Sequence, residues 1–405
     1  MQAAPSLAMV AGEASGDLLA SLMLQGLKAR WPGLKAGGIG GPRMVAEGFE
    51  AWADSERLSV FGYVDAIKRL PELLWLRRRT RMRIERERPA VFVGVDAPDF
   101  NFGLEQSLRQ SGMRTVHFVC PSIWAWRPHR VDKLKAAADH VLCLFPFEPE
   151  LLARHGVPST YVGHPLADLV PLERPTAQAR LALGLAPRAV ADEVMGSVLG
   201  PARGPGSTNE DPQGPLVALL PGSRRSEIRH IAPLLVQSAL RMLAQRPELT
   251  FLLPVAPGLR ECVEPLVADL AGTGRLRLLD GRSHQALAAA DVALVASGTA
   301  TLEAALLKCP MVIVYRLAEA DWRRMKRLRL QPWVGLPNIL SREFIVPERI
   351  QDDAQPQAVA EDALHWLDDA DAVERYRVRC TELHLTLRQD TGARAAEALR
   401  GLLDG

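Results

Sequence analysis

Residues 216–230 read LVALLPGSRRSEIRH and form the unit that decides the fold. Five apolar residues predict a buried β-strand, Pro221 and Gly222 end it in a tight turn, and the residues after Ser223 have a helical pattern. A strand, a glycine-containing turn and a helix in this order form part of a βαβ unit, in which successive strands are parallel.

The same order recurs along the chain. Short apolar runs, each followed by a turn and a helical pattern, lie at 6–10, 90–95, 115–120, 140–144, 249–255, 292–296 and 311–315. This alternation predicts an α/β fold with two doubly wound, Rossmann-like domains that face a cleft, each a parallel sheet covered by helices on both faces.

The length agrees with two domains, because 405 residues exceed the size at which a single hydrophobic core usually stops growing. We assign the N-terminal domain to residues 1–170, a linker to 171–215 and the C-terminal domain to 216–380. The later part of the linker is rich in Gly, Pro and Ser, which predicts a mobile surface loop. Residues 381–405 have a helical pattern, and we expect this helix to pack on the N-terminal domain or on a partner subunit, so a homodimer is one arrangement left open.

Composition excludes several classes of protein. The 49 Lys and Arg against 47 Asp and Glu give a net charge of +2, which provides no global field for nucleic acid. The five cysteines lie far apart without a C-x-x-C pair, which argues against a disulfide framework and a zinc site. No uncharged apolar stretch approaches the roughly 18–20 residues that span a bilayer, and the N-terminus lacks the basic region of a secretory signal. We expect a soluble cytoplasmic protein without a metal ion or cofactor.

Two strand-to-helix turns in the second domain are suited to anions, because ligands of open parallel sheets bind where strand ends feed helix N-termini. Both turns combine small residues with exposed backbone N–H groups, and the first adds a guanidinium that matches phosphate. Their residues are Gly222, Ser223 and Arg224, and Ser297, Gly298 and Thr299. With Glu303, which can accept hydrogen bonds from ribose hydroxyls, they predict a site for a nucleotide diphosphate. Helix capping and a solvated arginine are the alternative interpretations.

Carboxylates follow the strands of the first domain. Asp96 comes directly after the apolar run 91–95, where a carboxylate faces the cleft and can act as general base toward an acceptor hydroxyl. The stretch 12–17 (GEASGD) lacks the G-x-G-x-x-G spacing of a dinucleotide site, which disfavours an NAD-dependent dehydrogenase. Its acidic residues suit the hydroxyl groups of a sugar better than phosphate.

Two parts of the first domain carry apolar residues that could contact lipid, and each has a second interpretation. Trp124 and Trp126 lie in a loop after a strand, where they either hold an acyl chain or sugar face or serve as buried loop anchors. An amphipathic stretch followed by seven arginines fits either an interfacial helix on anionic lipid or a solvated helix face. The candidate contact residues in this stretch are Val64, Ile67, Leu70, Leu73, Leu74, Trp75, Arg77 and Arg78.

Taken together, these motifs resemble those of the lipid-A-disaccharide synthase family. The matching stretches run in order from residue 11 to about residue 340. They are AGEASGD, GGPRM, VGVDAPDFN, PSIWAWRPHRVDK, FPFE, VGHPLAD, LLPGSR, ASGTATLE, KCPMVIVYR and LPNIL. The final residues match only in general character, and the segment around 186–215 is longer than the usual link of the family.

The resemblance implies a GT-B fold and an inverting hexosyltransferase that needs no metal. Such an enzyme transfers 2,3-diacylglucosamine from UDP-diacylglucosamine to the 6-hydroxyl of diacylglucosamine 1-phosphate, forming the β-1,6-linked lipid A disaccharide and UDP. The resemblance also implies peripheral work on the cytoplasmic face of the inner membrane, with residues 64–74 in membrane contact. It implies roles in activity for Glu13, Asp96, Arg224 and Asn338, and only the resemblance singles out Asn338.

Other functions stay open on sequence grounds. Another UDP-sugar enzyme of the same fold, such as a polyprenyl-linked glycosyltransferase or a UDP-sugar epimerase, would share the phosphate site. A non-catalytic nucleotide-binding protein on the membrane surface would have no use for a cleft carboxylate such as Asp96. The amphipathic stretch argues against an epimerase of soluble sugars.

Overall fold

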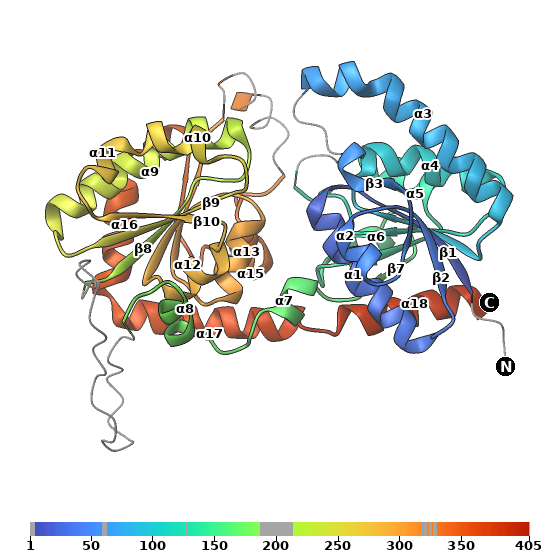
Figure 1. Ribbon diagram of the computed structural model, residues 1–405. Coiled ribbons are helices and arrows are strands. Elements are labelled where there is room, and N and C mark those ends of the chain that lie inside the picture. Colours follow the sequence, from blue (N-terminus) through green and yellow to red (C-terminus); the bar gives the residue numbers. More distant parts are fainter. Residues whose placement is uncertain are drawn as a thin grey trace. The chain divides into compact units, whose positions relative to one another are not determined.

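The computed structural model describes residues 5–58, 63–125, 128–186, 214–317, 319, 322–323, 326 and 330–404. The chain divides into two compact units (Figure 1). Unit 1 comprises Met1–Leu169, Leu328–Leu330 and Leu385–Gly405, and unit 2 comprises Val170–Arg327 and Gln331–His384.

Unit 1 contains a seven-stranded sheet in the order β3-β2-β1-β4-β5-β6-β7, and the neighbouring strands pair in parallel. The strands are β1 (Ser6–Ala11), β2 (Lys35–Gly40), β3 (Glu50–Asp54), β4 (Val91–Val95), β5 (Thr115–Phe118), β6 (His140–Cys143) and β7 (Ser159–Tyr161). The direction in which strands are added reverses between β1 and β4, and such a switch point is where open α/β sheets bind ligands.

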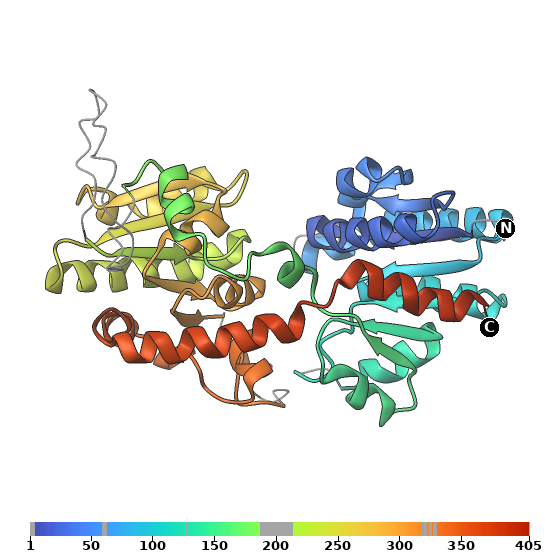
Figure 2. The same cartoon turned by 90° about the horizontal axis from the view of Figure 1, so that it is seen from below.

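Helices cover both faces of this sheet. They are α1 (Glu13–Arg30), α2 (Pro42–Ala46), α3 (Tyr63–Glu87), α4 (Pro98–Gln110), α5 (Arg130–Ala137), α6 (Glu148–Ala153), α7 (Pro165–Leu169) and α18 (Thr391–Asp404). Helices α1 and α18 lie side by side on one face (Figure 2). A Cβ atom built on Gly26 of α1 would lie 2.2 Å from the carbonyl oxygen of Gly392, so only glycine permits this approach. On the other face, Leu104 and Leu108 of α4 pack against Phe92 of β4.

Unit 2 contains a six-stranded parallel sheet in the order β10-β9-β8-β11-β12-β13. Its strands are β8 (Leu216–Leu220), β9 (Thr250–Val255), β10 (Leu276–Asp280), β11 (Val292–Ala296), β12 (Met311–Tyr315) and β13 (Glu348–Ile350). Its helices are α8 (Thr176–Ala182), α9 (Arg225–Gln245), α10 (Arg260–Val263), α11 (Ala268–Ala271), α12 (Ser283–Ala289), α13 (Thr299–Leu306), α15 (Leu336–Ser341), α16 (Pro356–Asp368) and α17 (Ala370–Leu387). The switch point lies between β8 and β11. Both units therefore have the Rossmann strand order, which confirms the predicted α/β fold with two doubly wound sheets.

The range 171–215, treated above as a linker, contains helix α8. This helix packs against α12 within unit 2. Arg174 tethers the preceding segment, because its guanidinium donates to the carbonyl oxygens of Leu287 (2.7 Å) and Ala288 (3.1 Å). Residues 187–213, the part of the linker expected to form a mobile loop, lie outside the described residues.

Candidate active site

A cavity of about 390 Å³ lies at the carboxyl ends of β8 and β11, at the switch point of unit 2. The predicted residues for a nucleotide diphosphate all line this cavity: Gly222, Ser223, Arg224, Ser297, Gly298, Thr299 and Glu303. The lining also includes residues that were not predicted from the sequence, among them Glu227, Ser283 and Ala300. We call this cavity the donor pocket.

The turn before α13 presents free N–H groups to the donor pocket. Gly298 has a φ of +152°, and a Cβ atom built there would meet no atom within 4 Å. Ser297 Oγ donates to the carbonyl oxygen of Val334 (3.1 Å), so this hydroxyl stabilises the turn. In the described part of the chain, nothing accepts a hydrogen bond from the N–H groups of Thr299 and Ala300. These groups carry the partial positive charge of a helix N-terminus and suit an anion.

The turn before α9 is closed by a carboxylate of the protein itself. Glu227 Oε2 accepts hydrogen bonds from the N–H groups of Ser223 (3.1 Å) and Arg224 (3.2 Å). Its Oε1 atom lies 2.9 Å from Arg224 Nη1, and the Arg224 side chain is 65% exposed. Gly222 has a φ of +107°, and a Cβ atom there would lie 2.5 Å from Glu227 Oε2. The two turns therefore differ, because Glu227 occupies the N–H groups of Ser223 and Arg224, whereas no acceptor among the described residues occupies those of Thr299 and Ala300. A glutamate at the third helical position, here Glu227, often accepts from the N–H group of the residue that precedes the helix, and this position could have indicated the closure.

Glu303 is held at the pocket by a histidine that no sequence motif had indicated. His284 Nε2 of α12 lies 3.2 Å from Glu303 Oε2, and the Glu303 side chain is 19% exposed. The hydrogen bond to Glu303 raises the pKa of His284. The contact with His284 holds one oxygen of the Glu303 carboxylate in place at the pocket.

Asp96 lies at the switch point of unit 1, directly after β4. It is half-buried, and its N–H donates to the carbonyl oxygen of Phe118 at 2.9 Å. Asp96 (φ +49°) and Ala97 (φ +43°) both have left-handed backbones. Aspartate adopts this region more readily than most residues, whereas for Ala97 it costs about 1 kcal/mol or more. A Cβ atom on Gly12 would lie 3.2 Å from Ala97 Cβ, so the turn after β1 packs against the turn that carries Asp96.

Two other acidic residues of unit 1 have structural partners. The buried Asp17 caps α2, since its carboxylate accepts hydrogen bonds from the N–H groups of Gly41, Arg43 and Met44. Asp99 is exposed and lies 2.8 Å from Arg130. The side chain of Glu13, the first residue of α1, lies outside the described residues. No group of three or more His, Cys, Asp or Glu residues in the described ranges is placed to hold a metal ion.

Trp124 is anchored by a buried carboxyl group. Its Nε1 donates to Glu148 Oε1 at 3.2 Å, and its ring meets the edges of Phe145 and Phe147 with centroid distances of 6.2 and 5.4 Å. Glu148 Oε2 also accepts from the N–H of Phe145 (3.0 Å). Burial raises the pKa of Glu148 to about 8. These contacts favour the loop-anchor interpretation for Trp124, whereas Trp126 lies outside the described residues.

Substituting Glu148 with Gln should flatten the pH dependence of the stability of unit 1. The folded-state pKa of about 8 lies above the reference value of 4.5, so the folded state binds the proton more tightly. The stabilisation of the folded state by this proton is complete below pH 4.5 and is lost as the pH rises through 8. It falls by about 1.4 kcal/mol per pH unit inside this window. Denaturant unfolding at several pH values between 5 and 8 measures this slope.

The control for this experiment is Glu150→Gln on the same helix, where the glutamate is exposed. Its pH profile should follow that of the wild-type protein. Equal slopes for Glu148→Gln and the wild type would show that the Glu148 carboxyl is ionised in the folded state.

Asn338 is buried and has partners for both ends of its amide. Nδ2 donates to the Val346 carbonyl and to Glu348 Oε1, both at 2.9 Å, and Oδ1 accepts from the N–H of Ile345 at 2.9 Å. Glu348 in turn accepts from the N–H of Val334 (2.9 Å). The carbonyl oxygen of Val334 accepts the hydrogen bond of the Ser297 hydroxyl. Asn338 is therefore connected to the α13 turn through Glu348 and Val334.

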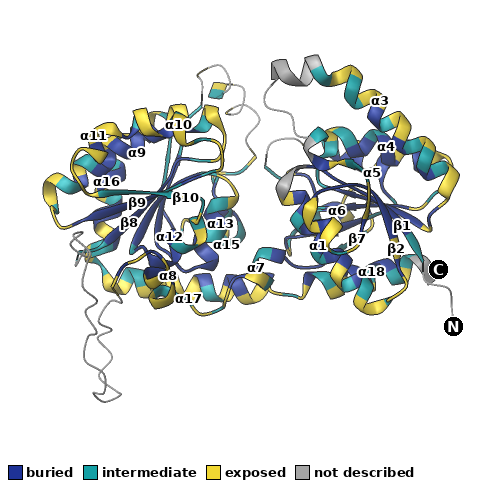
Figure 3. Cartoon of the chain, viewed as in Figure 1, coloured by how far each residue is buried: buried dark blue, intermediate teal, exposed yellow. Residues whose placement is uncertain are grey.

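Much of the middle of α3 is exposed (Figure 3), and its exposed residues include apolar side chains and arginines. Leu70, Leu74 and Trp75 are 50%, 45% and 52% exposed, while Leu73 is half-buried. Arg78 is exposed, whereas Arg77 packs against Gly103 of α4. We call Leu70, Leu74, Trp75 and Arg78 the α3 patch. The side chains of Val64 and Ile67 lie outside the described residues. In the described residues, no helix is long and apolar enough to cross a membrane.

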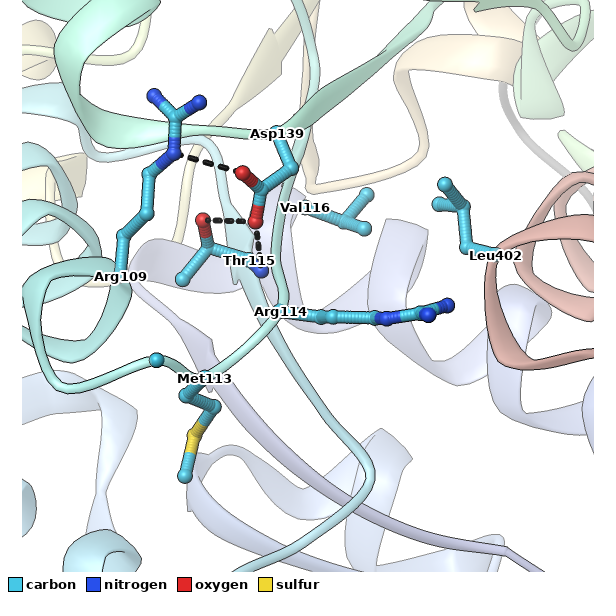
Figure 4. A pocket seen from close by; sticks show the side chains of 8 residues that line it. Arg109, Met113, Arg114, Thr115, Val116, Asp139 and Leu402 are labelled. Atoms are coloured by element: carbon cyan, nitrogen blue, oxygen red, sulfur yellow. Dashed lines mark hydrogen bonds and ion pairs between the residues drawn. The ribbon is translucent and has the colours of Figure 1, made fainter. Parts of the chain in front are cut away.

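A second cavity of about 430 Å³ lies at the start of β5, at the end of the sheet opposite to Asp96. Figure 4 shows Arg114 extending toward Leu402 across it, while Asp139 engages Arg109 and Thr115. The Asp139 carboxylate accepts from Arg109 Nε (2.6 Å) and from the N–H of Thr115 (2.9 Å). This cavity lies away from the residues predicted for the site.

Two Rossmann-like domains in one chain, with an anion-suited pocket at the switch point of the second, define a protein of the GT-B class. Solved structures show the same fold. UDP-GlcNAc 2-epimerase from Neisseria meningitidis bound to UDP-GlcNAc has a TM-score of 0.65 at 12% identity and covers 99% of this chain and 100% of that chain. CalG4, the calicheamicin glycosyltransferase, has a TM-score of 0.59 at 15% identity and covers 100% of this chain and 99% of that chain.

Sequence comparison identifies the family within this class. The family model described as lipid-A-disaccharide synthetase matches residues 7–197 and 206–400. The lipid-A-disaccharide synthase of Verminephrobacter eiseniae is 51% identical, with 100% of this chain and 98% of that protein covered. The enzyme of the same name from Albidiferax ferrireducens is 47% identical, with 98% and 97% covered. The chain therefore belongs to the lipid-A-disaccharide synthetase family, which confirms the resemblance seen in its motifs.

Proposed function

We propose that this protein transfers 2,3-diacylglucosamine from UDP-diacylglucosamine to the 6-hydroxyl of diacylglucosamine 1-phosphate, with inversion at the sugar carbon. The observation that carries the proposal is the family match, which extends over both units. A relative named lipid-A-disaccharide synthase is 51% identical in sequence to this chain. The positions of Asp96 and of the donor pocket at the two switch points support it.

The donor pocket supplies what a UDP leaving group requires. The N–H groups of Thr299 and Ala300, at the positive end of α13, would bind the diphosphate and stabilise the negative charge that develops on it. Glu303 would accept hydrogen bonds from the ribose hydroxyls. Arg224 would exchange its contact with Glu227 for a phosphate oxygen.

Asp96 would act as the general base. As the acceptor oxygen attacks the sugar carbon and the bond from that carbon to the diphosphate breaks, the hydroxyl proton moves to the Asp96 carboxylate. Attack from the face opposite to UDP gives the β-linked product. UDP leaves with the electron pair, so the step needs no oxidant and no co-substrate beyond the two sugars.

The α3 patch would bring the protein to its acylated substrates. Exposed leucines and a tryptophan beside arginines are the composition of a surface that binds anionic lipid. We therefore place the protein peripherally on the cytoplasmic face of the inner membrane. A homodimer stays a prediction.

The rival activities are less well supported. UDP-GlcNAc 2-epimerases share the fold at 12% identity, which says nothing about the reaction. The family match and the α3 patch both favour a transferase of lipid-linked sugars. A non-catalytic protein would not need the strained turn that presents Asp96.

One turnover experiment tests the proposed function. The protein is incubated with UDP-diacylglucosamine and diacylglucosamine 1-phosphate, and the products are followed by mass spectrometry. Disaccharide 1-phosphate and UDP should appear in equal amounts. Release of free diacylglucosamine without disaccharide, or no conversion of either sugar, would contradict the proposal.

Substituting Arg224 with Ala should raise the KM for the donor about tenfold, equivalent to ~1.4 kcal/mol. The effect is moderate because the Arg224 side chain is largely exposed and already contacts Glu227. Arg225→Ala is the control, since Arg225 is exposed in the same turn and does not line the pocket. Steady-state kinetics with varied donor concentration measures both variants, and an equal KM for both would remove Arg224 from the donor site.

A further inference from the structure

The turn that carries Asp96 must be held in place by its surroundings, because two successive left-handed residues other than glycine are unfavourable. The N–H of Asp96 is fixed to β5 through the Phe118 carbonyl (2.9 Å). The carbonyl group of Asp96, on the other side of the same turn, needs a partner as well.

Asn101 occupies that position. It lies in the first turns of α4 and is fully buried. Its Nδ2 atom lies 2.8 Å from the carbonyl oxygen of Asp96, 3.4 Å from that of Val95 and 3.3 Å from that of Val10. One amide nitrogen therefore joins the ends of β1 and β4 to the Asp96 turn.

The surroundings require a donor here. Each of the three neighbouring groups is a carbonyl oxygen, so a side chain that only accepts hydrogen bonds would face three acceptors. Asn101 Oδ1 is buried and has no partner among the described residues. The side chain thus contributes to the fold mainly through its donor nitrogen.

A second buried contact sets the distance between α4 and the sheet. Glu105 Oε1 of α4 lies 2.7 Å from His117 Nδ1 of β5, and both side chains are inaccessible to solvent. A Cβ atom on Gly94 would lie 2.1 Å from Glu105 Oε1 and 3.1 Å from Asn101 Cβ. Because position 94 is a glycine, the side chains of both Asn101 and Glu105 can approach the strand there. The contact between Glu105 and His117, one turn further along α4, thereby helps to fix the position of Asn101.

We propose that Asn101 is a positioning residue for the general base: by donating to the Asp96 carbonyl and to the ends of β1 and β4, it holds the strained turn in the conformation that presents the Asp96 carboxylate. This inference rests on the proposed function in its use of Asp96 as base. The effect of Asn101 on the backbone conformation of Asp96 does not depend on the proposed function.

The test compares Asn101→Leu with the wild type. The substitution keeps the approximate size of the side chain and removes its hydrogen-bond donor. An aspartate would not do so, because a carboxyl buried among three carbonyl oxygens stays protonated and donates through its O–H. We expect kcat to fall about a hundredfold, while the KM for the donor and the affinity for UDP change less than about twofold. Asn101→Ser keeps a shorter donor and should lose about tenfold in kcat, which provides a second measurement if the Leu variant does not fold.

Leu108→Ala is the matched control, since Leu108 is buried two turns further along the same helix, in the apolar cluster with Leu104 and Phe92. It should lower stability without lowering kcat of the folded enzyme. If the Asn101 variants lose no more kcat than Leu108→Ala, or if their loss appears in the donor KM, the inference is wrong.

A readout besides activity separates this inference from the proposed function. In a crystal structure of Asn101→Leu, which has no donor at this position, φ of Asp96 should leave the left-handed region. A retained positive φ would overturn the inference even if the wild-type enzyme makes the disaccharide. If the wild type makes none but φ shifts, the proposed function fails and the structural role of Asn101 stands.

Discussion

Replacing Asp96 with Asn should lower kcat about a thousandfold and leave UDP binding intact. The substitution keeps the side-chain shape in its turn after β4 but removes the group that takes the proton from the acceptor hydroxyl, a contribution of about 10²–10⁴ in rate. UDP binding should persist, because the described residues that line the donor pocket all belong to unit 2. Initial rates of disaccharide formation and UDP titration calorimetry measure the two effects.

Asp99→Asn is the control for this substitution. Asp99 lies three positions further along, its side chain is 89% exposed, and it contacts Arg130 rather than the switch point. Its rate should stay within about twofold of the wild type, as expected for an exposed ion pair. Near-normal turnover by Asp96→Asn would remove Asp96 from the role of base.

Replacing Glu303 with Ala should raise the donor KM and the Kd for UDP about a hundredfold. A carboxylate that accepts hydrogen bonds from the two ribose hydroxyls contributes about 1.5–3 kcal/mol for each charged hydrogen bond, and about 2.7 kcal/mol corresponds to a hundredfold. The His284 contact strengthens the expectation, since it keeps the carboxylate placed before the nucleotide arrives.

Glu261→Ala, at an exposed position of α10 in the same unit, controls for the change in net charge. Calorimetry with UDP measures the affinities of both variants. Equal affinity for UDP in Glu303→Ala and the wild type would place the ribose away from α13 and would contradict the assigned orientation of the nucleotide.

Much of the fold can be predicted because the central strands are buried on both faces. Fully buried parallel strands are continuous apolar runs, and the runs at 216–220, 292–296 and 311–315 coincide with β8, β11 and β12. The strands that the sequence analysis did not assign include β3, β7, β10 and β13, which lie at the sheet edges. Their residues are largely half-buried or exposed, so no apolar run marks them.

The candidate site could be predicted in part for a related reason. Small residues directly after an apolar strand mark a turn at the carboxyl end of the sheet, which identified the turns at 222–224 and 297–299. The contacts of Glu148, His284 and Asn101 had no such signal, because each is defined by side chains from different elements. Glu227 shows the limit of motif reasoning, since its carboxylate closes a turn that the residue types alone make suitable for phosphate.

The position of UDP in a crystal structure of the full-length protein tests the central claim most directly. We predict that the diphosphate oxygens lie within hydrogen-bonding distance of the N–H groups of Thr299 and Ala300, with the ribose hydroxyls on Glu303. A diphosphate bound in unit 1, or in unit 2 away from the α13 turn, would contradict the account.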